Sequence, residues 1–156
     1  MSDVHEFTLA LDLRDELSDG EMADLCWHLG FGPQPETLSI VTEFPAMAFD
    51  EESDEWISVD RPEALLNQRG PAARVGGAVF SELFRRENPA GWALTSRQEL
   101  HPDQFDEVGE LLCWMATKAD ANHVNGDGSV TVGFIRFLEQ TVPQPLKVSG
   151  DEVSWP

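Results

Sequence analysis

A stretch near the N-terminus recurs later in the chain, and this repeat restricts the available folds more than any other feature. Residues 9–17, LALDLRDEL, align without gaps on residues 92–100, WALTSRQEL, with five of nine positions identical. Apolar and polar residues alternate from Phe7 to Leu13, which is typical of a strand with one buried face. Each copy then leads into an apolar helical pattern that contains Leu-Cys-Trp, at residues 25–27 and 112–114. The sequence therefore predicts two related halves.

The first half is expected to read strand, helix, strand. Ser18 and Glu21 form a capping box ahead of a helix over residues 19–29, and Gly30 closes that helix. The apolar residues between 38 and 44 predict the next strand, and residues 55–59 predict another. The acidic run between them, residues 50–55, is expected to be an exposed hairpin loop.

Residues 62–87 allow two interpretations. The apolar residues between 75 and 84 fit one face of a helix, although the pair Gly76 and Gly77 costs such a helix about 2 kcal/mol relative to alanine. We favour the helix over residues 71–87, and a strand with a glycine bulge is the alternative. A turn at residues 88–91 then introduces the second copy, whose helix is longer by four residues and is followed by a strand around Val130 and Val132.

The expected fold is a single α+β domain spanning residues 1–156, a length that suits one hydrophobic core. Two pseudo-duplicated β-α-β(β) halves, residues 7–44 and 92–138, are connected by residues 45–91. Their helices should cover one face of a mostly antiparallel sheet. This plan resembles the split β-α-β arrangement called ferredoxin-like, and the resemblance implies an architecture only.

The charge restricts the partners. The chain has 29 acidic residues against 10 Lys and Arg, for a net charge of −19. Such a charge repels nucleic acid and anionic membranes and suits a basic protein partner. The alternative is that the acidity serves only solubility or life in a salty cytoplasm. Neither a membrane span nor a secretory signal is recognisable, so we expect a cytoplasmic protein.

Signatures of catalysis are missing from the sequence. We find neither a phosphate-binding loop nor a nucleophile elbow, and the two cysteines lack the neighbours of a zinc site. Cys26 and Cys113 are expected to be separate, reduced thiols. The sequence thus favours a protein that is not an enzyme and has no catalytic residue, metal or cofactor.

Two tryptophans form the main candidate binding site. On a helical projection Trp27 and Trp114 both point away from the apolar stripe of their helices. Carboxylates share those faces, namely Asp24, Glu107 and Glu110. An indole among carboxylates suits a cationic partner. We therefore expect a negatively charged, Trp-bearing face that binds a basic protein, as an inhibitor, immunity-type protein or adaptor does. The alternative is that residues 62–87 or a homodimer cover these indoles.

A second hypothesis is a small-molecule binder or enzyme with its site between the two halves. The repeat places two similar charged pairs, Arg14 with Glu16 and Arg97 with Glu99, and His101 follows the second. Arginine grips carboxylates with two hydrogen bonds, so a symmetric ligand site is one interpretation. The other interpretation is that these residues alternate on a strand end and pair with each other.

Overall fold

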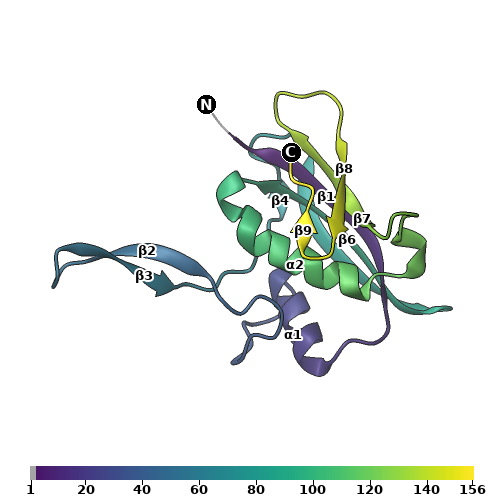
Figure 1. The fold of residues 1–156 in the computed structure, drawn as a ribbon, viewed down its shortest axis with the longest axis horizontal. Helices are drawn as coiled ribbons and strands as arrows, with labels where there is room; N and C mark the ends of the chain where they lie inside the picture. Colours follow the sequence, from purple (N-terminus) through teal and green to yellow (C-terminus); the bar gives the residue numbers. More distant parts are fainter. Residues whose placement is uncertain (1–2) are drawn as a thin grey trace.

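A computed structural model describes residues 3–156, which form a seven-stranded sheet, a separate two-stranded ribbon and two α-helices (Figure 1). The seven strands occur in the order β4-β5-β6-β1-β7-β8-β9, and β2 and β3 make up the ribbon. The strands are β1 (His5–Arg14), β2 (Pro45–Asp50), β3 (Glu55–Asp60), β4 (Gly70–Pro71), β5 (Ala78–Glu87), β6 (Ala90–Leu100), β7 (Val130–Phe137), β8 (Gln144–Ser149) and β9 (Glu152–Val153). The helices are α1 (Asp19–His28) and α2 (Phe105–Lys118), with short 3-10 turns at Pro102–Gln104 and Ala121–His123.

All pairings within the large sheet are antiparallel. Strand β1 lies between β6 and β7, so β6 and β7 run parallel to each other with β1 between them. Helix α2 connects these two strands. In the same way β1 and β5 run parallel with β6 between them, and α1 lies in their connection. Each helix therefore belongs to a crossover that leaves room for one intervening strand.

Both helices lie against one face of the sheet (Figure 1). The residues of β1 that face them, Phe7, Leu9, Leu11 and Leu13, are at most 3% exposed, whereas Ala10 and Arg14 on the opposite face are exposed. The core combines this face with the inner sides of both helices, including Leu25 and Leu112. The expected α+β class with a mostly antiparallel sheet is confirmed. The helices have 10 and 14 residues, so the predicted difference of four is also confirmed.

The strand predicted over residues 38–44 is wrong, because these residues form a loop without a ladder partner. Their backbone finds other acceptors: the Asp24 carboxylate accepts hydrogen bonds from Ser39 N at 2.6 Å and Ile40 N at 2.9 Å. Val41 and Phe44 still bury their side chains in the core. The spacing of the apolar residues between 38 and 44 therefore predicted their burial correctly but their secondary structure incorrectly.

The helix favoured over residues 71–87 is also wrong, because β5 occupies residues 78–87. Val79 and Ser81 face the core, whereas Phe80 and Phe84 are exposed on the other side of the sheet. Apolar residues on both faces produce a spacing that mimics a helix. The glycine pair precedes this strand, and Gly76 has a φ of 81°, which side-chain-bearing residues rarely adopt.

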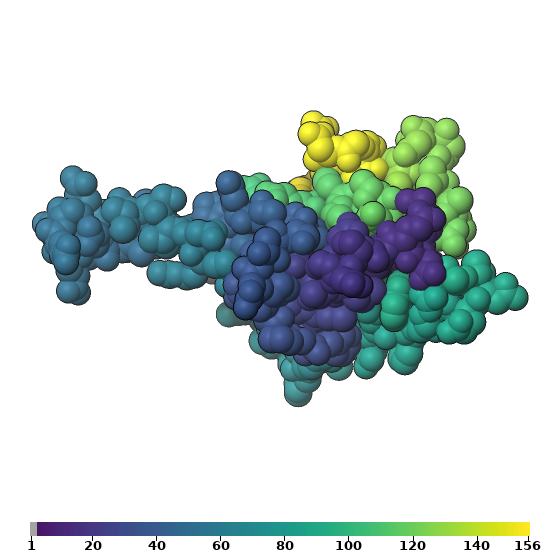
Figure 2. Space-filling view, turned by 90° about the horizontal axis from the view of Figure 1, so that it is seen from below, coloured from purple at the N-terminus to yellow at the C-terminus, as the bar shows by residue number. Residues whose placement is uncertain are grey.

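Strands β2 and β3 form an arm that projects from the body of the molecule (Figures 1 and 2). We call residues 45–60 the arm. Its register pairs Pro45 with Asp60 and Asp50 with Glu55. The tip between the strands, residues 51–54, is exposed, as the acidic run predicted. Among residues 3–156, no further strand pairs with the arm.

Candidate functional site

Trp27 does not lie on an outer face, and that expectation is wrong. Its side chain is 8% exposed and contacts the Phe44 ring edge-on, with centroids 6.0 Å apart. Asp24 is fully buried and holds the 38–41 loop through the two backbone bonds already described. A loop thus covers the side of α1 that the helical projection left free.

Residues 62–66 complete this cover over the end of α1, in line with the alternative that the 62–87 segment hides an indole. Leu65 N donates to His28 Nδ1 at 3.2 Å, and Leu66 N donates to the His28 carbonyl at 2.9 Å. His28 has no exposed surface, and its burial lowers its pKa to about 4. The imidazole is therefore neutral and structural at physiological pH.

Trp114 lies half-buried between the two helices. Its indole Nε1 donates to the Glu21 carboxylate of α1, and Lys118 Nζ lies 3.5 Å from the same carboxylate. Hydrogen bonds from the Ser18 backbone, and then from Trp114, lower the Glu21 pKa. Glu21 thus closes the predicted capping box and joins the helices. Trp114 is part of an internal junction rather than a free aromatic surface.

The residues of the second hypothesis are not brought into one pocket. Along the β1–β6 ladder Arg97 lies opposite Thr8 and Arg14 opposite Gly91, which puts six residue steps, about 20 Å, between the two arginines. Arg14 pairs locally with Glu16 at 3.5 Å. The interpretation that the repeated residues pair with each other is therefore confirmed for Arg14 and Glu16.

For Arg97 and Glu99 the predicted pairing is wrong, because each residue bonds other partners. Arg97 bonds the Glu6 carboxylate and donates to the Gly76 and Ala78 carbonyls at 2.8 Å. The Glu99 carboxylate accepts from the backbone N–H groups of residues 73 and 74. The His101 side chain accepts from the N–H of residue 103 and caps the short turn that precedes α2. These contacts organise loops and leave no shared ligand site.

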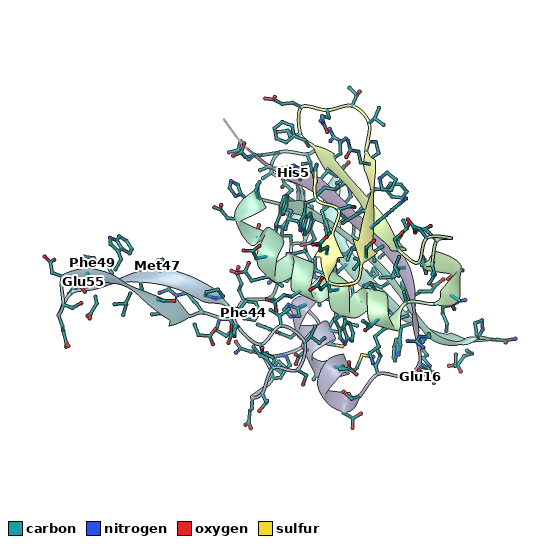
Figure 3. All side chains as sticks on the ribbon, in the orientation of Figure 1. His5, Glu16, Phe44, Met47, Phe49 and Glu55 are labelled. Carbon is teal, nitrogen blue, oxygen red and sulfur yellow. The ribbon has the colours of Figure 1, made fainter. Side chains whose placement is uncertain are left out.

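The arm carries three large, exposed apolar side chains that lie close together. Trp56 is 66% exposed, Met47 58% and Phe49 46%, and all three lie on one face of the ribbon. The Trp56 and Phe49 rings meet edge-on with centroids 5.6 Å apart. Ile57 is exposed on the opposite face. Figure 3 shows Met47 and Phe49 on the arm, far from His5 and Glu16 on the body. Clustered apolar exposure of this kind marks interaction sites.

The charge around this patch has a single sign. From residue 36 to residue 60 the chain contains no Lys, Arg or His. The arm and its root, the residues next to Pro45 and Asp60 where the ribbon joins the body, carry seven carboxylates: Glu43, Asp50, Glu51, Glu52, Asp54, Glu55 and Asp60. The arm therefore combines an exposed indole and a phenyl ring with carboxylates that have no basic neighbour in their own segment.

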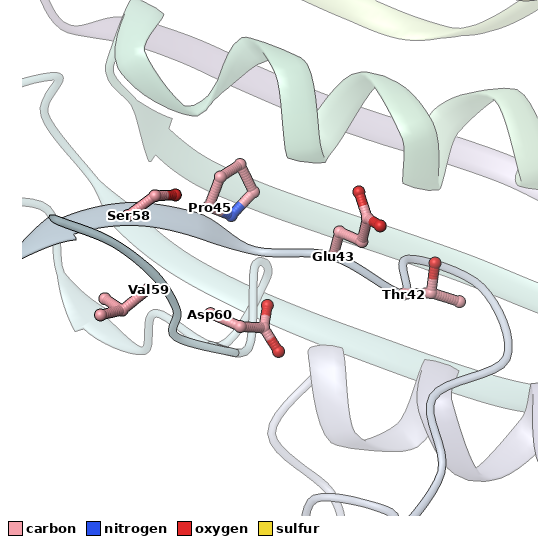
Figure 4. Close-up of a pocket in the computed structure, with 6 residues that line it drawn as sticks. All are labelled: Thr42, Glu43, Pro45, Ser58, Val59 and Asp60. Atoms are coloured by element: carbon pink, nitrogen blue, oxygen red, sulfur yellow. The ribbon is translucent and has the colours of Figure 1, made fainter.

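The root of the arm is anchored to the body. Phe44 is 3% exposed, its N–H donates to Asp60 Oδ1 at 2.8 Å, and its carbonyl accepts from Arg61 N at 2.8 Å. A depression of about 400 Å³ lies at this root, lined by Thr42, Glu43, Pro45, Ser58, Val59 and Asp60 (Figure 4). Its two carboxylates extend the acidic surface from the arm to the body.

Helix α2 continues this acidic surface. Burial, followed by repulsion from Glu107, Glu43 and Asp106, raises the pKa of Glu110. This repulsion links the helix to the arm root, because Glu43 directly precedes the buried anchor Phe44. Glu110 is exposed and Glu107 is partly buried, and Glu110 lies close enough to Glu43 at the arm root to feel its charge.

No family model, no curated protein and no solved structure matches the chain. Within residues 3–156 we find no helix long and apolar enough to cross a bilayer. The same residues contain no cluster of three or more His, Cys, Asp or Glu side chains that is arranged to hold a metal ion. The helical projection indicated Trp27 and Trp114 and gave no indication of the arm. The signal that identifies it is Trp56 next to an acidic run in a segment without cations.

Proposed function

We propose that the protein is an acidic binding protein that engages a basic protein partner through its arm. The observation that carries this proposal is the exposed Trp56, Phe49 and Met47 face on a projecting ribbon whose charges are all negative. Buried aromatic anchors supply much of the free energy of protein–protein binding, and a surrounding charge of one sign selects a partner of the opposite sign.

The rest of the acidic surface supports the same function. Glu43, Glu107 and Glu110 continue the negative charge from the arm root onto α2. Because Trp27 is buried against Phe44 and Trp114 is half-buried against Glu21, their proposed role is to hold α1 and the root of the arm in place. An inhibitor or adaptor that presents an acidic projection to a basic cleft fits this arrangement.

For the architecture we propose a ferredoxin-like plan built from two duplicated halves, with boundaries that differ from those predicted. The strand order β5-β6-β1-β7, with one helix in each crossover, supports this plan. The first half then ends at β5, and the arm is an insertion between α1 and that strand. An insertion that adds a projecting ribbon to a complete sheet is a natural place for a binding function.

Site-specific photo-crosslinking tests the binding function. A benzophenone amino acid replaces Ile57 on the arm in one variant and Phe84 on the open sheet face in a matched control, since both side chains are exposed. We expect position 57 to crosslink a protein with a pI above about 9, and we expect Trp56→Ala and added salt to reduce the yield. Equal capture from both positions, or capture of acidic proteins from position 57, would contradict the proposal.

A further inference from the structure

The backbone of the arm has a defined set of groups that point outward. Arg61 N donates to the Phe44 carbonyl, and this pair continues the β2–β3 register one step beyond Pro45 and Asp60. Hydrogen-bonded and non-hydrogen-bonded pairs alternate in an antiparallel ladder. The next pair, Pro45 with Asp60, is therefore non-hydrogen-bonded, and the alternation continues to the tip. In such pairs the N–H and C=O groups point away from the neighbouring strand.

The two edges of the arm differ as a result. The outward groups of β3 belong to Trp56, Ser58 and Asp60, and each of these residues has an N–H donor. The outward groups of β2 belong to Pro45, Met47 and Phe49, and proline has no N–H. Strand β3 thus has the more complete edge, and within residues 3–156 neither edge is paired with another strand.

An isolated two-stranded ribbon is at best marginally stable in water, and a third strand is the usual remedy. Proteins commonly protect free edges with lysine, proline or a bulge. The β3 sequence, EWISVD, contains neither lysine nor proline, and its register with β2 is unbroken. The edge therefore lacks these protections.

We propose that the outer edge of β3 accepts an extended, basic segment of the partner as a third strand. This inference rests on the proposed function and specifies how the partner binds. Main-chain hydrogen bonds to Trp56, Ser58 and Asp60 hold the segment, as in other cases of strand addition. Charge complementarity selects it, because the β3 side chains that flank the apolar centre are Glu55 and Asp60.

The side chains of β3 specify the pattern of the segment. Trp56 and Asp60 lie on one face, and Glu55 and Ile57 lie on the other. Residues directly opposite across a ladder interact most strongly. The segment that fits carries Lys or Arg at its two ends, opposite the carboxylates, and β-branched apolar residues opposite the indole and the isoleucine.

A synthetic peptide tests this mode of binding. The probe is the capped hexapeptide Lys-Thr-Thr-Val-Val-Lys. Two isomers are N-methylated at alternate residues, one at positions three and five and the other at positions two and four. Composition and charge are the same in both isomers, but only one of them loses the N–H groups that face β3. We expect one isomer to bind like the parent peptide and the other at least tenfold more weakly, by tryptophan fluorescence and by chemical shifts of the Trp56 and Ser58 amides.

Protein variants supply the matched control. Ser58→Pro removes an outward N–H and leaves the bonds between β2 and β3 in place, whereas Ser58→Ala keeps that N–H. We expect Ser58→Pro, and not Ser58→Ala, to weaken the peptide at least tenfold. If the two isomers bind equally, strand addition is overturned, while the proposed function survives through charge and apolar contact. The inference is also overturned if the parent peptide does not bind, or if the protein sediments as a dimer joined through the β3 edge. In either case the crosslinking experiment tests the proposed function separately.

Discussion

Replacing Trp27 or Trp56 by alanine removes the same indole from two opposite environments. Trp27 is 8% exposed and belongs to the core, whereas Trp56 is 66% exposed on the arm. A buried tryptophan removes about 200 Å² from water, worth about 5 kcal/mol at 25 cal/mol per Å². Trp-to-Ala changes in cores cost about 3–5 kcal/mol, and we expect this loss for Trp27→Ala. For Trp56→Ala we expect about 1 kcal/mol, from the edge-on contact with Phe49.

Urea denaturation measures the difference. With a slope of about 2 kcal/mol per M, Trp27→Ala lowers the midpoint by about 1.5–2.5 M and Trp56→Ala by about 0.5 M. Trp27→Phe is the milder variant if Trp27→Ala does not fold. In the crosslinking assay the ranking reverses, because Trp56→Ala removes the proposed anchor. The reasoning is refuted if the two alanine variants lose equal stability, since Trp56 would then be as well covered as Trp27.

Three further outcomes follow from buried polar groups and thiols. Asp24→Ala leaves two backbone N–H groups without their acceptor, so we expect a loss of about 2–3 kcal/mol and faster hydrogen exchange at those two amides. His28 has a folded-state pKa of about 4 against an ordinary 6.5, so its contribution to the stability of the fold is complete above pH 6.5 and is lost as the pH falls toward 4. Over this pH window the urea midpoint should fall less in His28→Asn than in the wild type. Part of the pH dependence should remain in that variant, because burial also lowers the pKa of His5. Burial raises the pKa of both Cys26 and Cys113, so iodoacetamide should label the native protein at least tenfold more slowly than the urea-unfolded protein, and equal rates would contradict this assignment.

The elements that sequence predicted correctly are those specified by local chemistry. Ser18 and Glu21 set the start of α1 through side-chain bonds within one turn, and the alternation from Phe7 to Leu13 reflects one buried face. These signals involve neighbours in sequence. They do not depend on how distant segments pack.

The errors arose where a distant segment determined the outcome. The projection of α1 placed Trp27 off the apolar stripe, but it had no information about Phe44, which packs on the indole, or about the Leu65–Leu66 segment, which bonds His28. Burial on both sides also explains why the polar Asp24 was mistaken for a surface residue. Its carboxylate accepts a hydrogen bond from the backbone N–H of Ser39, 15 residues further along the chain. Helical periodicity shows which residues lie off the apolar stripe, but it does not show whether solvent or another segment of the chain contacts them.

The distribution of charge distinguishes the two explanations of the acidity. In the body, basic side chains lie within 4 Å of carboxylates at Arg14, Arg85, Arg86, Arg97, Arg136 and Lys118. The arm has carboxylates and no basic residue at all. A requirement for solubility alone favours a polar surface on the segment that projects furthest into water, and it gives no reason to expose Trp56, Phe49 and Met47 there. Under the proposed function, a basic partner covers both the negative charge and the exposed aromatic surface of the arm.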